Sequence, residues 1–358
     1  MIDLFQDIAR AFDLSVPTSL RKGIGIVGAG GIVEYAHLPA YAKAGLEVIG
    51  VFDLNSDRAQ ALAKAREFVA FTSLDALLDD PRVQVVDIAV LPDAQPEIAH
   101  KALKAGKHLL CQKPLALELA VAREIEREAH SRGLSVVVNQ QLRYSESLTV
   151  ARELIRQGWI GEANFMQVTV NVLTDWSLWP WLVNSQKLEI MFHSIHYLDA
   201  VRSFFGEPQR VFCMASRMPG QAAVGETRTV SNLIYAGERR ALVTVNHENR
   251  TKDNVAEFRI EGTTGAIRGT LGLMYDYPHG RVDTLEVRGE RTDGWVPYPV
   301  TTRWIPDAFI GPMRALLHTI ETGQEAPSSA RDNLGTVRLV QALYNSIDSG
   351  QSVIVGEA

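Results

Sequence analysis

Cysteine and long apolar segments are scarce in this sequence. The 358 residues include only two cysteines, Cys111 and Cys213, which lie far apart in apolar surroundings. We therefore expect two small core residues in a reducing compartment, and neither a disulfide framework nor a metal pair. No apolar run approaches the ~18 residues that a membrane-spanning helix requires, so the sequence predicts no membrane partner.

Excess positive charge is also absent. The formal net charge is −6, which gives no electrostatic reason for the protein to bind nucleic acid or an anionic membrane. The first 14 residues mix acidic and apolar residues at helical spacing and contain no basic n-region, so we expect no secretory signal. These observations favour a cytoplasmic location.

A glycine-rich turn near the start of the chain is the first feature that points to a ligand. Residues 24–27 are an apolar run that predicts a buried parallel strand, and a helical pattern follows the turn at residues 28–31. This unit is typical of a dinucleotide pyrophosphate site, because Gly28 permits the tight turn, Gly30 lets the backbone approach the phosphates, and the helix start receives the negative charge. An ordinary strand-to-helix turn is the alternative. The residues of this segment expected to bind the cofactor are Gly28, Gly30, Gly31 and Ile32.

An acidic residue at the end of the next predicted strand supports a cofactor site. Asp53 ends the strand predicted at residues 47–52 and lies 23 residues after Gly30, close to the ~20-residue spacing of a carboxylate that binds the adenosine ribose. An aspartate here can instead cap the following helix. Asp53 favours NAD, because its carboxylate would repel a 2′-phosphate, whereas the nearby Arg58 leaves NADP open. Val33 departs from the pattern, since a small residue is usual there, and we expect the packing of helix on strand to differ.

The order of strands and helices divides the chain into two parts, as its length predicts. Residues 21–140 alternate strands and helices, which predicts a Rossmann domain with a doubly wound parallel sheet. Residues 141–358 contain longer strands of alternating polarity, which predict an α+β domain with a large, mostly antiparallel, open-faced sheet. Residues 1–20 are expected to form a helical extension outside both. The fold class is therefore α/β, and the apolar patch on a one-faced sheet predicts a homodimer or homotetramer built through it.

Three further segments carry a family resemblance. They are AGKHLLCQKPLA at residues 105–116, NQQLRY at residues 139–144, and HYLD at residues 196–199 followed by FGEP at residues 205–208. In this order and spacing the chain resembles the glucose–fructose oxidoreductase/inositol dehydrogenase/rhizopine catabolism (Gfo/Idh/MocA) family from about residue 23 to the C-terminus. The resemblance implies a small, carbohydrate-like substrate, a sugar, cyclitol or related polyol, whose secondary hydroxyl exchanges a hydride with NAD or NADP.

The resemblance also implies catalytic residues. Lys113 follows the fifth predicted strand, at the edge where doubly wound sheets bind ligands, and its ammonium can stabilise a developing alkoxide. A lysine in a solvated turn is the alternative. His196 resembles the family's catalytic histidine, which exchanges the hydroxyl proton, and an imidazole with its ordinary pKa of about 6.5 suits that task. The alternative is a helix histidine with structural hydrogen bonds. Further cofactor contacts are expected from Leu91, Pro92, Gln95 and Gln112.

The sequence departs from the family pattern at several positions. Gln112 stands where the family usually has glutamate, so its amide can bind a ribose hydroxyl but carries no charge. Leu91 occupies a position where threonine is common, and Gln95 lies near the usual histidine. The aspartate usually found four residues before the catalytic histidine is Phe192, and the usual glycine two residues before it is Ser194.

A replacement for the missing carboxylate is expected on the same helix. At ~100° per residue, Glu189, His193 and His196 fall on one helical face, so we expect them to form a rebuilt acid/base set. A carboxylate and two imidazoles are also able to bind Zn²⁺ or Mn²⁺. Their spacing matches no standard metal motif, so we expect no metal.

Two more residues are predicted to contact the substrate. Arg143 ends the Rossmann pattern, and the alternative to substrate binding is a clamp at the domain junction. Trp176 lies in the tryptophan-rich segment 173–181, where its indole is expected to stack on a sugar ring, with a packing loop as the alternative. Two other functions stay open. One is a lyase, epimerase or glycosidase that oxidises its substrate transiently and recycles NAD, and the other is a non-catalytic binding protein of the same fold.

Overall fold

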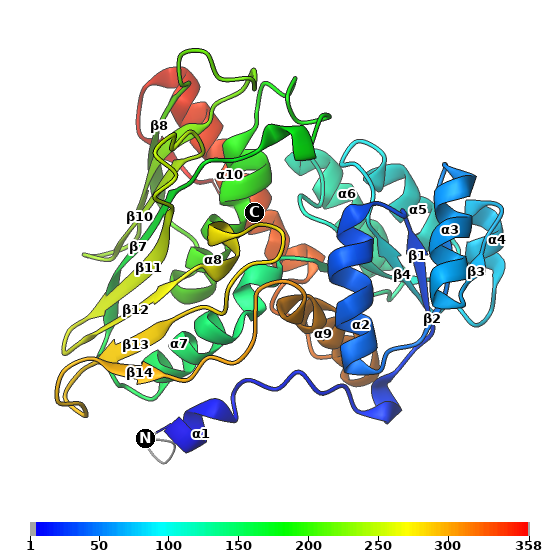
Figure 1. The fold of residues 1–358 in the computed structure, drawn as a ribbon, viewed down its shortest axis with the longest axis horizontal. Helices are drawn as coiled ribbons and strands as arrows, with labels where there is room; N and C mark the ends of the chain where they lie inside the picture. Colours follow the sequence, from blue (N-terminus) through cyan, green and yellow to red (C-terminus); the bar gives the residue numbers. More distant parts are fainter. Residues whose placement is uncertain (1–4, 357–358) are drawn as a thin grey trace. The chain divides into compact units, whose positions relative to one another are not determined.

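The computed structural model describes residues 5–356, which form two units (Figure 1). The Rossmann unit comprises residues 14–141 and 305–337, and the sheet unit comprises residues 142–304 with the described segments 5–13 and 338–356.

Six parallel strands form the sheet of the Rossmann unit, in the order β3-β2-β1-β4-β5-β6. The strands are β1 (Ile24–Val27), β2 (Val48–Phe52), β3 (Val69–Ala70), β4 (Val85–Ile88), β5 (His108–Cys111) and β6 (Val136–Val138). Strands β1 and β4 are buried at every position, as their apolar runs require when both faces of a sheet are covered. The order reverses between β1 and β4, and doubly wound sheets bind ligands beyond the carboxyl ends of the strands at such a reversal.

Helices connect these strands, and local sequence signals begin several of them. The connecting helices are α2 (Leu38–Ala44), α3 (Ser56–Arg66), α4 (Leu74–Asp79), α5 (Gln95–Lys104) and α6 (Leu119–Ser131). Helix α9 (Ile310–Thr322) comes from the later segment of this unit. Asn55 caps α3 by accepting the Arg58 N–H, and Ser73 caps α4 in the same way. A π-helical turn, η3 (Val33–His37), precedes α2. It begins at the buried Val33, the position where the sequence predicted unusual helix packing.

Nine strands form the sheet unit, in the order β14-β13-β12-β11-β7-β10-β9-β8-β15. They are β7 (Ala163–Asn171), β8 (Arg210–Ser216), β9 (Arg228–Ile234), β10 (Arg240–Asn246), β11 (Val255–Gly262), β12 (Ala266–Thr270), β13 (Leu285–Arg288), β14 (Val296–Tyr298) and β15 (Val353–Ile354). Strands β7 and β10 pair in parallel, and the other pairs are antiparallel. The mostly antiparallel sheet predicted from the sequence is therefore confirmed.

Helices cover one face of this sheet and leave the other face open (Figure 1). The covering helices are α7 (Glu146–Arg156), α8 (Ile195–Phe205) and the second half of α10 (Ala330–Ser349). Every second residue of β9 and β10 is buried, and the residues between them stay partly exposed. This alternation is typical of a sheet with a single covered face, which the sequence also predicted.

The division of the chain differs from the one predicted, which placed residues 141–358 in a single domain. Residues 305–337 belong to the Rossmann unit, where the Val138 N–H donates to the Ser328 carbonyl at 2.8 Å, next to the edge strand β6. The edge strand leaves backbone groups without a strand partner on one side, and this late segment supplies one.

The N-terminal segment also differs from the separate extension predicted for residues 1–20. Phe5 is buried in the sheet unit and its ring stacks on Trp159 at 5.4 Å between centroids. Residues 5–13 thus belong to the sheet unit, and residues 14–20 belong to the Rossmann unit. Residues 1–4 lie outside the described part of the chain.

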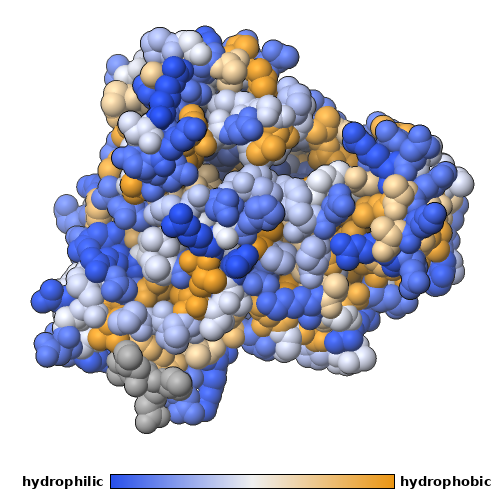
Figure 2. Space-filling model, in the orientation of Figure 1, coloured by the Kyte–Doolittle hydropathy of each residue, from blue (hydrophilic) through white to orange (hydrophobic). Residues whose placement is uncertain are grey.

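No helix within residues 5–356 has the length and apolar character needed to cross a membrane. On the face seen in Figure 2, hydrophobic residues form small patches between hydrophilic ones.

Candidate active site

The glycine turn after β1 has the geometry of a phosphate cradle. Gly28 has φ +107°, and a Cβ atom there would lie 2.2 Å from the Ala89 carbonyl oxygen, so only glycine fits. A Cβ at Gly30 would meet no atom within 4 Å. The backbone is therefore open at Gly30, where the pattern requires close approach of a pyrophosphate. The residues present fit a dinucleotide cofactor.

Asp53 is held beside this turn. Its Oδ2 accepts the Ala29 N–H at 2.7 Å, and its Oδ1 accepts the Asn55 N–H at 2.8 Å. The side chain of Asn55, rather than Asp53, caps α3. Asn55 therefore fills the helix-capping role that was the alternative for Asp53. The Asp53 carboxylate lies at the glycine turn, where a ribose-binding residue is expected.

Gln95 supports a loop instead of presenting its amide to a ligand. It is 1% exposed, and its Nε2 donates to the carbonyl oxygens of Gln112, Pro114 and Leu115 at 2.8, 2.9 and 3.0 Å. The sequence predicts a direct cofactor contact for Gln95. The geometry instead makes Gln95 a brace for the loop that carries Lys113, whereas Leu91 is 51% exposed beyond β4.

Lys113 lies in that loop, directly after β5. The side chain is partly exposed, and desolvation lowers the pKa of its ammonium from 10.5 to about 8. Because parallel strands end at one edge of a sheet, the residues after β1, β2, β4 and β5 share this edge. The structure thus brings the predicted cofactor residues and Lys113 to one edge of the Rossmann unit.

The helical segment of the sheet unit that carries the histidines is irregular. It starts with a π-helical turn, η6 (Ile190–Ser194), so the rotation of ~100° per residue assumed for the predicted triplet does not apply. Glu189 is fully buried, and its two oxygens accept the hydroxyls of Ser194 at 2.5 Å and Thr229 at 2.6 Å. Glu189 therefore braces the helix start against β9 and does not share an open face with His193.

His247, which the sequence analysis missed, connects Glu189 to His193. Its Nε2 lies 3.8 Å from Glu189 Oε1, its Nδ1 lies 2.6 Å from Thr174 Oγ1, and its ring centroid lies 4.7 Å from that of His193. His247 follows β10 and Thr174 follows β7, the parallel pair of the sheet. The carboxyl ends of parallel strands meet, and this signal could have identified His247.

Trp176 is buried rather than open to a sugar ring. It is 5% exposed, packs edge-on against His193 at 5.4 Å between centroids, and donates its indole N–H to Glu248 Oε1 at 3.3 Å. The geometry favours the packing alternative over the predicted stacking. His196 is nearly buried on α8, and its ring meets Trp304 edge-on at 5.7 Å.

Comparison with known families agrees with both units. The family model described as "Oxidoreductase family, NAD-binding Rossmann fold" matches residues 22–140, and the model of the GFO/IDH/MocA C-terminal domain matches residues 148–268. The chain belongs to the Gfo/Idh/MocA family. It is an oxidoreductase with an NAD-binding Rossmann unit, and the resemblance noted in the sequence is confirmed.

Several members of the Gfo/Idh/MocA family match along most of the chain. A D-apiose dehydrogenase from Paraburkholderia graminis is 26% identical over 344 residues, which cover 94% of this chain and 90% of that protein. A 1,5-anhydro-D-fructose reductase from Ensifer adhaerens is 26% identical over 273 residues, which cover 74% of this chain and 80% of that one. The solved structure of an Agrobacterium radiobacter oxidoreductase with NAD+, L-tartaric acid and magnesium has a TM-score of 0.82 at 21% identity, covering 94% and 99% of the two chains. That structural likeness shows the shared fold.

The sequence predicts no metal at the helical segment of this Gfo/Idh/MocA protein that carries Glu189, His193 and His196. Residues 5–356 contain no group of three or more His, Cys, Asp or Glu side chains that could hold a metal ion. That the triplet of Glu189, His193 and His196 binds no metal stays a prediction, which metal analysis of the purified protein tests.

Arg143, the remaining predicted substrate residue, is engaged inside the sheet unit. Its guanidinium binds the Asp199 carboxylate with two hydrogen bonds, Nε to Oδ2 at 2.7 Å and Nη2 to Oδ1 at 2.6 Å, and both side chains are buried. A planar guanidinium that makes this paired contact orients α8, which also carries His196. The geometry favours a structural clamp over substrate binding.

Loss of this clamp should destabilise the sheet unit. We expect Arg143→Met to lower the free energy of unfolding by about 3–5 kcal/mol, because it leaves the buried Asp199 carboxylate without its main partner. Denaturant unfolding followed by circular dichroism measures this. Arg156→Met is a suitable control, since Arg156 is 72% exposed in its pair with Glu153, and it should leave the midpoint nearly unchanged. Equal midpoints for both variants would contradict the clamp.

Proposed function

We propose that this enzyme interconverts a secondary hydroxyl and its carbonyl on a sugar, cyclitol or related polyol, with NAD as the preferred cofactor. The main support is the carboxyl edge of the Rossmann sheet, where the open turn at Gly30, the Asp53 carboxylate and the Lys113 ammonium follow β1, β2 and β5. Two of the relatives are named as a D-apiose dehydrogenase and a 1,5-anhydro-D-fructose reductase, and these names support the proposed substrate class.

The proposed roles follow from the chemistry of the side chains. When bound, the nicotinamide supplies the hydride acceptor for oxidation and the donor for reduction. The backbone N–H groups of residues 30–32 hold the pyrophosphate, Gly28 permits the tight turn, and Asp53 accepts hydrogen bonds from the ribose. Lys113 donates to the reacting oxygen and stabilises the charge that develops there. His196 takes the hydroxyl proton in oxidation and returns it in reduction. Leu91, Pro92 and Gln112 complete the proposed cofactor contacts.

His193 is proposed as a second acid/base group in place of the missing aspartate. Phe192 occupies the family's aspartate position, and the buried pair of Glu189 and His247 lies behind the His193 ring. The His247 ring contacts both the Glu189 carboxylate and the His193 ring, and this arrangement supports a joint role for these groups.

A substrate screen tests the proposed function. Purified enzyme is incubated with NAD and a panel that includes D-apiose, other aldoses, cyclitols and sugar acids, and with NADH and 1,5-anhydro-D-fructose, while the absorbance of the reduced nicotinamide is followed. We expect a saturable change with at least one polyol or sugar. No change across the panel with either cofactor would count against the assignment.

Asp53 should set the cofactor preference. We expect kcat/KM with NAD to exceed that with NADP at least about tenfold, because a carboxylate at the ribose repels a 2′-phosphate. Asp53→Ser should raise kcat/KM with NADP and so lower the ratio of kcat/KM with NAD to kcat/KM with NADP. Initial rates with both cofactors measure the effect, and Asp57→Ser is a control on the exposed start of α3. A wild-type preference for NADP would contradict this role.

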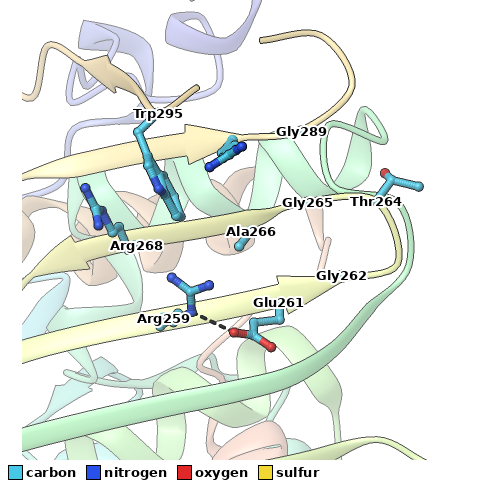
Figure 3. A pocket seen from close by; sticks show the side chains of 10 residues that line it. Arg259, Glu261, Gly262, Thr264, Gly265, Ala266, Arg268, Gly289 and Trp295 are labelled. Carbon is cyan, nitrogen blue, oxygen red and sulfur yellow. Dashed lines mark hydrogen bonds and ion pairs between the residues drawn. The ribbon is translucent and has the colours of Figure 1, made fainter. Parts of the chain in front are cut away.

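We further propose that two or four copies associate through the open face of the sheet. Val230 and Met214 are neighbours across β9 and β8, and Met214 is 56% exposed. Farther along the same sheet, the Trp295 side chain reaches the strand that carries Arg268, and Arg259 lies on the next strand (Figure 3). The guanidinium carbons of Arg268 and Arg259 lie 4.2 and 5.5 Å from the Trp295 ring centre. Tryptophan, methionine and arginine are enriched in protein interfaces.

A charge on the open face should disrupt this association. We expect wild-type protein to sediment as a dimer or tetramer and Val230→Glu to sediment as the 39.5 kDa monomer, because burying an unpaired carboxylate in an interface is costly. Leu178→Glu is the control, since Leu178 is 53% exposed but belongs to no strand of the sheet. A wild-type monomer would contradict the proposal.

We also propose a cytoplasmic location. Cys111 and Cys213 are both buried free thiols, and burial raises the pKa of each well above its ordinary value. Neither thiol has a disulfide role, which suits a reducing compartment.

A further inference from the structure

A chain of hydrogen bonds leads from a buried carboxylate of the Rossmann unit to the loop that carries Lys113. Tyr41 donates its hydroxyl to Asp87 Oδ2 at 2.7 Å, and His37 Nδ1 lies 2.6 Å from the same oxygen. On the other side of the imidazole, Gln112 Nε2 lies 2.6 Å from His37 Nε2. Gln112 Oε1 accepts the backbone N–H of Lys113 at 3.3 Å. The chain thus connects a fully buried carboxylate to the backbone of the proposed catalytic lysine.

The orientation of the Gln112 amide determines which nitrogen of His37 carries the proton. Because Oε1 faces the Lys113 N–H, the amide NH₂ faces His37, and an NH₂ group can only donate. His37 Nε2 must therefore accept, and Asn139 Nδ2 approaches this nitrogen as a second amide donor at 3.4 Å. His37 Nδ1 holds the proton and donates it to Asp87. An imidazolium would place an N–H opposite an NH₂ group, with no acceptor between them.

The groups around the imidazole are compatible with this neutral form. Burial and the Asp87 carboxylate raise the pKa of Tyr41 well above its ordinary value, so its hydroxyl stays a donor. Burial and Asp87 also raise the pKa of the Cys111 thiol. Phe309 adds an apolar ring, edge-on to His37 at 5.1 Å between centroids. Asp87 Oδ2 is therefore satisfied by two hydrogen-bond donors without requiring a charged imidazole.

We propose that His37 is a positioning residue for the cofactor edge of the Rossmann unit, the carboxyl edge of its sheet where Gly30, Asp53 and Lys113 lie. Its neutral Nδ1–H tautomer, held by Asp87 and Tyr41, orients the Gln112 amide and, through it, the backbone of Lys113. His37 is fully buried and acts only through Gln112. In this orientation the amide keeps one hydrogen and one lone pair for a ribose hydroxyl. The inference rests on the cofactor role proposed above for this loop.

Gln112 is the residue on which the tautomer depends. A glutamate, which the family usually has at this position, offers acceptors on both oxygens. One carboxylate oxygen could then accept the Lys113 N–H while the other accepts an N–H from His37 Nε2. Gln112→Glu is therefore expected to convert His37 into an imidazolium, paired with carboxylates on both sides.

Nitrogen NMR of the full chain, labelled with ¹⁵N-histidine and measured without cofactor at neutral pH, tests the tautomer. The resonances that disappear in His37→Gln identify His37. We expect a protonated Nδ1 and an unprotonated Nε2 in the wild type, and protons on both nitrogens in Gln112→Glu. Wild-type His37 with a proton on Nε2, or an unchanged spectrum in Gln112→Glu, would overturn the inference.

Cofactor affinity tests the positioning role without any substrate. NAD is titrated while tryptophan fluorescence is followed, and we expect His37→Gln to raise the Kd about fivefold, the loss of one oriented hydrogen bond. His100→Gln is the control, because His100 pairs with Glu128 elsewhere in the same unit, and it should leave Kd unchanged. An unchanged Kd in folded His37→Gln would overturn the role. Wild-type protein that fails to bind NAD would instead refute the proposed function, and the NMR result would still decide the tautomer.

Discussion

Replacement of His196 by glutamine is expected to lower kcat by about 10²–10⁴-fold, the usual effect of losing a general acid–base group. Glutamine keeps a polar side chain of similar reach but exchanges no proton. Glutamine is close to histidine in size and can fill the space beside Trp304, so the substitution should leave the fold of α8 intact. Steady-state kinetics with a substrate from the screen measures the effect, and circular dichroism checks the fold.

A comparison with His193→Ala distinguishes the catalytic roles of His193 and His196. If His193 has replaced the missing aspartate, His193→Ala should lose activity as well, by a smaller factor than His196→Gln. Full activity in His193→Ala together with loss in His196→Gln would leave His196 as the sole acid–base group. Full activity in His196→Gln would contradict the proposed mechanism.

Replacement of Lys113 by methionine is expected to lower kcat by about 10²–10³-fold, the effect of removing one donor that stabilises a developing oxyanion. Methionine preserves much of the apolar stem, so the loss reports on the ammonium. Lys107→Met is a suitable control, because Lys107 is another lysine of the Rossmann unit, bound to the carbonyl oxygens of Asp80 and Val83. An equal loss in both variants would indicate a structural effect.

The pH dependence of the wild-type enzyme should carry the signature of Lys113. Desolvation lowers its pKa from 10.5 to about 8, so the ammonium is present below that pH and is lost as the pH rises through it. We expect kcat/KM for oxidation to fall above about pH 8. In Lys113→Arg, where the guanidinium stays charged, the remaining activity should not fall in this range. Activity that rises through pH 8 would indicate that the neutral amine acts as a base.

The cofactor edge could be predicted from the sequence because its signals are local. Gly28 and Gly30 are set by backbone sterics within one turn, and Asp53 follows from strand length and spacing. The parallel sheet follows from apolar runs that alternate with helices. The role of Gln95 could not be predicted in this way, because its three carbonyl partners lie 17 to 20 residues away.

The histidine cluster was harder to predict because its geometry is not local. The π-helical turn at residues 190–194 changes the rotation per residue, and the hydroxyls of Ser194 and Thr229 engage the buried Glu189 carboxylate. His247 comes from a strand more than fifty residues later, and only the parallel pairing of β7 with β10 brings it to Thr174. The sequence predicts that Trp176 faces a ligand. Its indole is instead buried against Glu248, and this contact depends on the pairing of β7 with β10.

Direct hydride transfer between the substrate and NAD is the central claim, and an isotope experiment tests it most directly. Sugars and polyols deuterated at the carbinol carbon are incubated with the enzyme and NAD, and the reduced nicotinamide is analysed by mass spectrometry. The account predicts that deuterium appears in the reduced cofactor, which accumulates in step with the oxidised product. Turnover without net reduced cofactor, as in a lyase or epimerase that recycles NAD, or deuterium released to water, would contradict it.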